Sequence, residues 1–437
     1  MSGPPGRSLR DAGTTAVDPR PAPSTAQQRR KAAVPAALVS LALLGVNGLA
    51  YVMTVVAARA LAPEAFGELA ALLGVMFIGV VPATALQTAA ALTLGANPPD
   101  RPAVQARLHT TTWAGAAGVG VLGLVAVGPL VTLLHLSGPS TVLWLTAVLV
   151  PHTLVGGYDG LLQGNRRYGR LALVNTTFGV LKSGGGITGL VVGGTPEAAL
   201  IGMAAGCAAS AVVGWWFCGR PGFAGGIRGH VVAAAKASGA LLGLVLMVNL
   251  DLLLARHHLS ADLAGEYAVA SIFAKVAFWL PQGVSVVLLP RLAHARGRRR
   301  LLPVAAALVA VVGALLTAAT AVLGARALPL VGGAEYGDAL GGATWVFAML
   351  GTLFALAQLL LYSGIAASDR IAAVAVWCAV ALEAAAVEAL AAREGLTVLT
   401  IAGIAVGASV LLVGTGMLRL WRTHAREGLE LRAAAAR

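Results

Sequence analysis

The stretch Arg59-Ala-Leu-Ala-Pro-Glu-Ala-Phe-Gly-Glu-Leu-Ala70 is matched later in the chain by Arg256-His-His-Leu-Ser-Ala-Asp-Leu-Ala-Gly-Glu-Tyr-Ala268. Each stretch follows a long apolar run and leads directly into another. The two arginines lie 197 residues apart, and the two Gly-Glu pairs lie 198 residues apart. The match indicates a duplicated unit, and internal repeats are typical of membrane transporter folds.

Two further matches extend the repeat. Pro82 and Pro281 each lie inside the next apolar run and are 199 residues apart. Arg170-Leu-Ala-Leu-Val174 and Arg370-Ile-Ala-Ala-Val374 are 200 residues apart. A slowly growing offset is what rare single-residue insertions leave in a duplicated unit. The alternative is chance matching in a chain rich in alanine, leucine and valine, but four matches in register favour duplication.

The composition indicates an all-α integral membrane protein. Apolar residues make up 58% of the chain and charged residues 11%, whereas a soluble domain carries about 25% charged residues. Apolar runs of about 20 residues are long enough to span a bilayer as helices. We predict about 12 transmembrane helices, at roughly 33–58, 68–94, 109–134, 140–162, 171–193, 198–218, 234–255, 267–289, 301–324, 339–362, 371–391 and 396–418.

Lysine and arginine residues at the span ends predict the orientation. Twenty of them flank the spans on one side, whereas only Arg59, Arg256, Arg326 and Arg393 flank them on the other. Because cytoplasmic loops carry the excess of these residues, the first side is predicted to be cytoplasmic, with both termini. The net charge of +13 follows mostly from this signal and needs no nucleic-acid partner; it also favours contact with anionic membrane lipids.

The repeat unit contains six spans, so both copies have the same orientation and form a parallel repeat. We expect two six-helix lobes around a central cleft, with alternating access as one lobe rocks against the other. Pro82 and Pro281 should kink paired helices that line the cleft, although static kinks are an equal alternative. The predicted organisation is a disordered cytoplasmic tail (1–31), an N-terminal lobe (32–219), a cytoplasmic linker (220–236), a C-terminal lobe (237–420) and a basic tail (421–437).

Lys182 is predicted to lie near the middle of the fifth span, about 18 Å along the helix from Arg170. Placing an ionisable side chain at that depth costs free energy of membrane insertion, so its presence indicates a function or an ion pair. The following Ser183-Gly-Gly-Gly186 should weaken the helix and expose backbone N–H groups that can bind an anion. A phosphate-binding role and a structural ion pair both remain open.

Three further ionisable residues are predicted to lie within the membrane. Glu383 is at matching depth in the repeat mate of the fifth span, so Lys182 and Glu383 could pair across the cleft. Lys275 lies deep in the eighth span, and Asp251 lies in the seventh. They either form an ion pair with each other, or Lys275 faces the cleft while Asp251 orients it or carries a proton.

The cysteines Cys207, Cys218 and Cys378 have neither the spacing of a metal site nor that of a disulfide framework. We therefore expect no metal and no cofactor. No nucleotide-hydrolysis motif is present, so any transport is predicted to use the membrane potential, an ion gradient or the substrate gradient.

Several segments resemble the polysaccharide biosynthesis or lipid-linked oligosaccharide flippases of the multidrug/oligosaccharidyl-lipid/polysaccharide (MOP) exporter superfamily. The matching segments are Val-Val-Ala-Ala-Arg59 through Gly67, Asn249-Leu-Asp251 through Arg256, Gly265-Glu-Tyr-Ala268, Pro281, Leu-Pro290-Arg291 and Gly333-Ala-Glu-Tyr336. The resemblance covers about 33–420. It implies the two-lobed MATE/MOP-like fold and a bacterial plasma-membrane location.

The resemblance also implies a cargo, a polyprenyl-diphosphate-linked oligosaccharide that moves from the inner to the outer leaflet. A polysaccharide polymerase or ligase is an implied further partner. By position, Lys182, Lys275, Arg59 and Arg256 are the candidates for binding the diphosphate. Asp251, Glu383, Pro82 and Pro281 are the candidates for coupling or gating.

Two other functions compete with flipping. An ion-coupled multidrug exporter on the same fold would carry its coupling proton on Asp251 or Glu383. A non-transporting or enzymatic member of a polysaccharide assembly complex is the third reading. The predicted outer loops are too short for a sugar-transferring enzyme, and no catalytic residue is predicted.

Overall fold

The computed structural model describes residues 45–226, 228–280, 295–336, 340–366, 370–393 and 395–435. Within these ranges the chain is helical, with turns and short irregular segments between the helices and no strand. The predicted tail 1–31 and Pro281 lie outside the described residues.

The helices of the first half follow the predicted spans closely. After a helix over residues 45–60 come α2 (Pro63–Gly79), α3 (Val81–Gly95), α4 (Arg101–Val125), α5 (Val127–Leu133), α6 (Pro139–Gly164), α7 (Tyr168–Gly193) and α8 (Pro196–Phe217). The second half contains α9 (Arg228–His258), α10 (Ala261–Trp279), α12 (Ala295–Leu323), η1 (Gly324–Arg326), α13 (Ala327–Gly332), α14 (Trp345–Ala366), α15 (Arg370–Ala391) and α16 (Val398–Ala435).

Local sequence signals explain where several helices begin. A proline occupies the first turn of α2, α4, α6 and α8, where its missing N–H costs nothing. The Asp100 carboxylate accepts the Ala103 N–H at 3.3 Å, and the Thr195 hydroxyl accepts the Ala198 N–H at 3.1 Å. These side chains cap α4 and α8.

Nine helical segments of the described chain are long and apolar enough to cross a membrane. The other three predicted spans correspond to the helix 45–60, α7 and α10. Nine of the predicted spans are thus matched by helices that could cross a membrane, and the described parts of the other three are helical; the chain is a multi-pass membrane protein.

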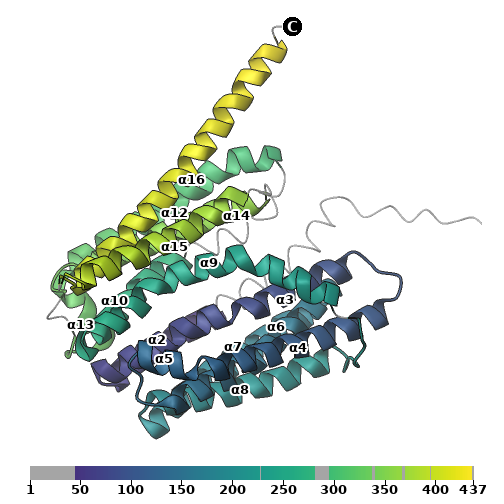
Figure 1. Ribbon diagram of the computed structural model, residues 1–437, viewed down its shortest axis with the longest axis horizontal. Coiled ribbons are helices and arrows are strands. Elements are labelled where there is room, and N and C mark those ends of the chain that lie inside the picture. Colours follow the sequence, from purple (N-terminus) through teal and green to yellow (C-terminus); the bar gives the residue numbers. More distant parts are fainter. Residues whose placement is uncertain are drawn as a thin grey trace, which may run out of the picture.

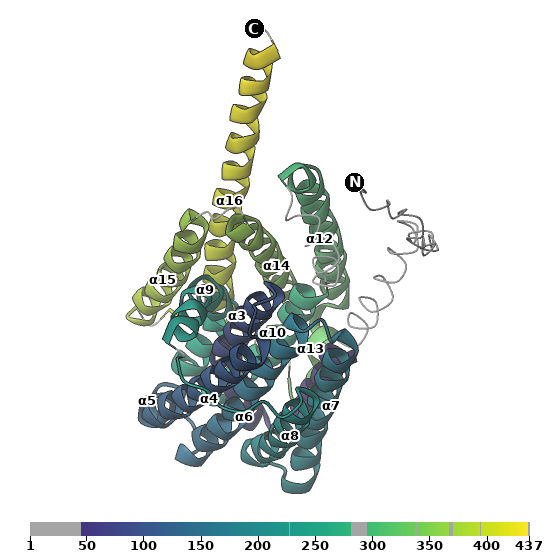
Figure 2. The same ribbon diagram turned by 90° about the vertical axis from the view of Figure 1, so that its right-hand side faces the viewer.

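The helices form two lobes that correspond to the two halves of the sequence (Figure 1). The first lobe contains the helix 45–60 and α2 to α8, and the second contains α9 to α16. The lobes contact each other mainly through α2 and α3 on one side and α9 and α10 on the other. Figure 2 shows the same separation after a quarter turn, with α12, α14, α15 and α16 grouped apart from α4, α6, α7 and α8.

The second span is broken where its proline predicts a kink. Helix α2 ends at Gly79, and α3 begins at Val81 with Pro82 in its first turn. Pro82 has no N–H to donate to the carbonyl four residues earlier, which favours a break at this point, whereas α6 runs through Pro151 and α12 through Pro303. Because α2 and α3 both face the other lobe, the break lies at the interface between the lobes.

One local prediction is wrong. The run Ser183–Gly186 does not weaken its helix, since α7 continues through it from Tyr168 to Gly193. The backbone N–H groups there belong to the helix and are not a free anion cradle. A Cβ atom at Gly185 would collide with the carbonyl oxygen of Gly202 on α8, so the small residues serve close helix packing.

The lobe boundaries are less sharp than the predicted domain limits. Helix α8 ends at Phe217, and α9 already begins at Arg228, inside the predicted linker 220–236. At the other end, α16 continues as one helix from Val398 to Ala435, so the predicted basic tail extends the last span away from the lobes (Figure 1).

Candidate functional site

The end of the molecule that the charge count assigns to the outside is closed by contacts between the lobes. Arg256, in the last turn of α9, is only 4% exposed. Its guanidinium donates to the carbonyl oxygens of Leu134 at 3.0 Å, His135 at 3.0 Å and Glu64 at 3.3 Å. All three acceptors belong to the opposite lobe, so Arg256 is an interlobe anchor.

Arg59 makes the corresponding contact from the first lobe to the second. It lies near the end of the helix 45–60 and donates to the carbonyl oxygens of Val331 at 3.1 Å and Leu330 at 2.6 Å. Both acceptors lie in α13 of the second lobe. In this conformation, therefore, both repeat arginines are engaged by backbone carbonyls rather than by a cavity.

The two glycines of the repeated motif meet between the lobes. A Cβ atom at Gly67 would lie 3.1 Å from the backbone nitrogen of Gly265 and 3.3 Å from a guanidinium nitrogen of Arg256. A Cβ atom at Gly265 would collide with the Pro63 carbonyl. Only glycine allows the first turns of α2 and α10 to approach this closely.

Two cavities lie between the lobes, farther from the end that the charge count assigns to the outside than these contacts are. The central cavity has a volume of about 130 Å³ and is lined from α2, α7, α10 and the helix 45–60. Its polar lining residues are Asn47, Tyr51, Thr54, Lys182, Ser183, Ser271 and Lys275. None of its lining residues is acidic.

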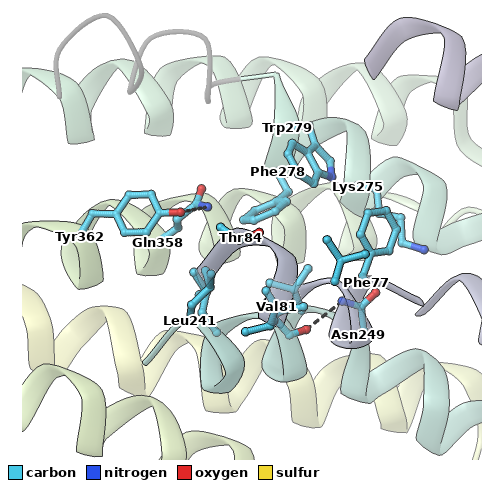
Figure 3. Close-up of a pocket in the computed structure, with 14 residues that line it drawn as sticks. Phe77, Val81, Thr84, Leu241, Asn249, Lys275, Phe278, Trp279, Gln358 and Tyr362 are labelled. Carbon is cyan, nitrogen blue, oxygen red and sulfur yellow. Dashed lines mark hydrogen bonds between the residues drawn. The ribbon is translucent and has the colours of Figure 1, made fainter. Parts of the chain in front are cut away.

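The inner cavity is larger and more apolar, with a volume of about 240 Å³. Its polar groups are few: Thr84, Asn249, Lys275, Gln358 and Tyr362. Figure 3 shows Gln358 and Tyr362 at one end and Lys275 at the other, with aliphatic and aromatic side chains between them. Apolar walls with a few placed polar groups are typical of a ligand site.

Lys275, Phe77 and Trp279 line both cavities. The Phe77 and Trp279 rings come from opposite lobes, with their centroids 6.4 Å apart. They form an aromatic partition between the two cavities, and Lys275 lies beside it, with Nζ 5.9 Å from the Phe77 ring centroid. Lys275 therefore reaches both cavities.

Lys182 and Lys275 approach the central cavity from different lobes. Lys182 Nζ lies 5.1 Å from the Phe178 ring centroid. No carboxylate of the described residues lies within ion-pair distance of either lysine, whereas His258 and Glu388 do form an ion pair, at 3.0 Å. Of the two alternatives for Lys182, the cavity-facing position is the one observed, and the structural ion pair is absent.

The predicted acids gather inside the second lobe. The Tyr267 hydroxyl donates to Asp251 at 2.8 Å, and Asp251 shares a small pocket with Lys275. Glu383 on α15 is fully buried and close enough to Asp251 for the two carboxyl groups to interact. Both carboxyl oxygens of Glu383 lack a hydrogen-bond partner among the described residues.

Two predicted pairings are therefore not formed in this conformation. Lys182 lines the central cavity, whereas Glu383 lies within the second lobe beside Asp251. Asp251 interacts electrostatically with Lys275 but takes its hydrogen bond from Tyr267, so the two ionisable residues are neighbours without a direct ion pair.

Sequence reasoning missed the acceptors of the arginine contacts and the aromatic partition. The acceptors of Arg59 had a signal in the sequence, because Leu330 and Val331 belong to Pro329-Leu-Val331, which repeats Pro129-Leu-Val131 of α5 at an offset of 200. The acceptors of Arg256 lie outside that repeat. Phe77 and Trp279 carry no such signal, since they are aromatic residues in apolar runs.

No protein-family model matches the chain, and no curated protein matches it in sequence. Solved structures do match its fold. An inward-facing multidrug resistance MATE family transporter of the MOP superfamily aligns with a TM-score of 0.65 and 13% identity, over 85% of this chain and 94% of that one. A eukaryotic MATE transporter aligns with a TM-score of 0.63 and 12% identity, over 91% of this chain and 98% of that one.

An outward-facing MATE family transporter of the MOP superfamily aligns less closely, with a TM-score of 0.56 and 13% identity, over 90% of this chain and 94% of that one. Likeness at this level of identity establishes the fold. The chain thus has the two-lobed fold of MATE transporters of the MOP superfamily, and the predicted fold class is confirmed.

Proposed function

We propose that the chain is an alternating-access transporter that flips an anionic lipid, a polyprenyl-diphosphate-linked oligosaccharide, from the inner to the outer leaflet of the plasma membrane. The observation that carries the proposal is the central cavity, where Lys182 and Lys275 enter from opposite lobes with no acidic residue in the lining. Two cations without carboxylate partners favour an anion between them.

The shape of the site supports a lipid-linked cargo. The inner cavity continues from the lysines with mostly apolar walls, and the two cavities together are too small for a whole lipid-linked oligosaccharide. In this proposal the lysines hold the diphosphate, and the polyprenyl chain stays in the bilayer between the lobes. Both termini are cytoplasmic, and a polysaccharide polymerase or ligase receives the cargo outside.

Energy coupling is assigned to the buried acids. Glu383 and Asp251 lie close together in a low-dielectric interior, where two negative charges repel strongly. Binding of a proton relieves the repulsion, and Asp251 is next to Lys275 in the small pocket. Proton uptake in the second lobe can thus change the charge that Lys275 presents to the cargo.

The second candidate is an ion-coupled multidrug exporter on the same fold. The unpartnered Glu383 favours it, because an exporter of cationic drugs needs an acid that a proton and a drug can exchange. Against it, neither Glu383 nor Asp251 lines the central or the inner cavity. A drug cation in the central cavity would meet lysines instead.

Reconstitution in liposomes separates the two functions. A fluorescent polyprenyl-diphosphate oligosaccharide should become accessible to an external quencher. We expect Lys182→Ala and Lys275→Ala each to slow flipping by about tenfold or more, the cost of losing a charge-assisted contact of about 1.5–3 kcal/mol. Arg393→Ala, which removes an exposed cation from an outer turn, is the matched control.

If the unmodified chain leaves the lipid in place and expels a cationic dye, the exporter replaces the flippase. If flipping is intact in both lysine variants, the assignment of the diphosphate to these side chains is wrong.

A further inference from the structure

The contacts that close the outer end are reciprocal. Arg256 of the second lobe reaches the end of α5, and Arg59 of the first lobe reaches the end of α13. Helices α5 and α13 occupy equivalent places, since each is the short last segment of the third span of its lobe. Each lobe therefore uses the same repeat residue to reach the C-terminal end of the corresponding short helix in the other lobe. The acceptors are not at matching positions, since Leu330 and Val331 lie inside α13 whereas Leu134 and His135 follow the last residue of α5.

Hydrogen bonds from an arginine to carbonyl groups at a helix end can hold two lobes together and still break reversibly. The last carbonyl groups of a helix have no partner within the helix and carry the negative end of its dipole. A guanidinium offers several donors in a planar fork and stays charged at any physiological pH. When the lobes separate at the outer rim, water can replace both sides of the contact, whereas a buried pair of charges would resist separation.

The neighbouring side chain of α9 strengthens one of the two contacts. A ring nitrogen of His257 lies 2.7 Å from the carbonyl oxygen of Leu133, next to the acceptors of Arg256. The buried Arg256 has three carbonyl acceptors, and the exposed Arg59 has two. The contact of Arg256 is thus the stronger half of an approximately symmetric pair.

Below the arginines, the first turns of α2 and α10 touch through Gly67 and Gly265. The central and inner cavities lie on the other side of this contact, so it separates them from the outside. The repeated Arg…Gly-Glu motif thus supplies both the closely packed helices and the side chains that hold them together.

We propose that Arg59 and Arg256 are two latches of an outer gate: their hydrogen bonds to the ends of α13 and α5 hold the gate shut in this conformation and break when it opens outward. The inference rests on the alternating access of the proposed function, but not on the identity of the cargo. It replaces cargo binding as the role of these two arginines.

Thiol labelling from outside measures gate opening without any cargo. Thr54→Cys places a thiol in the lining of the central cavity, in a chain whose exposed Cys378 is changed to Ala. In right-side-out vesicles, a membrane-impermeant maleimide should label it slowly. Arg256→Met should speed labelling about fivefold or more and Arg59→Met about two- to threefold, since each releases hydrogen bonds that favour the closed state.

Arg393→Met is the matched control, because it removes an exposed outer cation that has no hydrogen bond across the lobes to another described residue. It should leave the labelling rate unchanged. Unchanged labelling in Arg256→Met and in the double variant Arg59→Met/Arg256→Met would overturn the latch. Faster labelling without any flipping of the lipid probe would support the latch and reject the proposed cargo.

A cross-link tests the closed gate by a readout other than the labelling rate, and it leaves Arg256 unchanged. Arg59→Cys and Leu330→Cys place thiols on the two sides of one latch, and Leu330 is exposed. A short, reductant-cleavable cross-linker between them should stop transport of the lipid probe or the dye, whichever the unmodified chain carries, and reductant should restore it. Transport that continues at full rate while cross-linked would refute the gate.

Discussion

The two lobes close against each other with the same parts, yet they differ at the depth where a cargo would pass. At one end, Arg59 and Arg256 both donate to backbone carbonyls near the C-terminal end of a short helix in the other lobe, and Gly67 meets its repeat mate Gly265. Farther from that end, the first lobe presents Lys182 to the central cavity, whereas Glu383, at nearly the equivalent sequence position in the second lobe, is buried away from the cavity.

This difference indicates which features a duplicated transporter can share between its halves. Closure needs matching surfaces, so both copies keep the motif. Binding and coupling need different chemistry, and the polar side chains differ accordingly. The first lobe places Lys182 at the central cavity, whereas the second lobe places Lys275 there with Asp251 next to it in a separate small pocket. The variants below test whether the division is real.

The largest effect is expected at Glu383. Glu383→Gln keeps the shape of the side chain and removes its ability to bind a proton. Because both carboxyl oxygens lack partners, the neutral amide should leave the thermal midpoint unchanged or higher. Ion-driven transport in liposomes with an imposed pH gradient should nevertheless fall by about tenfold or more, as expected for a functional intramembrane acid.

Glu388→Gln is the control for this experiment, because Glu388 lies on the same helix but is exposed and paired with His258. It should transport at the rate of the unmodified chain. Equal losses in the two variants would show that the buried acid has no special part in coupling and would remove the proposed chemical difference between the lobes.

A smaller effect is expected from the packing of α7. Gly185→Ala should lower the unfolding free energy by about 1–3 kcal/mol, the usual cost of overpacking, because its Cβ atom collides with the Gly202 carbonyl. Gly184→Ala is the neighbouring control, with no atom within 4 Å of its Cβ position. Thermal unfolding in detergent compares them.

The same pair of variants separates packing from anion binding. If the glycine run held the diphosphate, Gly184→Ala would reduce the rate of flipping with no loss of stability. In the second lobe, α15 has no glycine at all, so α7 and its mate have diverged in packing as well as in charge.

The parts of this protein that could be predicted from sequence are those that recur along the chain. Apolar runs predicted the nine helical segments that could cross a membrane, and the duplicated motif predicted two lobes. The depth of Lys182 and Lys275 along their helices followed from helical rise alone, but depth left a cavity position and an ion pair open for each lysine. The direction of a side chain around its helix does not follow from depth, and for that reason the pairing of Lys182 with Glu383 could not be settled.

The glycine run shows a second limit of the sequence. Three consecutive glycines weaken an isolated helix, but close packing against α8 outweighs that intrinsic preference and keeps α7 intact. The partition formed by Phe77 and Trp279 depends on how two distant helices meet, and no local pattern contains that information.

The smallest effect is expected at Pro82, where the second span breaks beside the other lobe. Pro82→Ala restores a backbone donor and should stiffen the span. The gain is offset by the greater conformational entropy of the unfolded chain, so the free energy of unfolding should change by less than about 1 kcal/mol. If bending of this span accompanies the rocking of the lobes, flipping in the liposome assay should slow about two- to threefold, a barrier change of under about 1 kcal/mol. Pro303→Ala is the control, because Pro303 lies inside α12, which packs within its own lobe. Equal rates in the two variants would show that the break at Val80 is a static feature. Rocking of the lobes would then not require the second span to bend, and any bending at the interface would have to occur in α9 or α10.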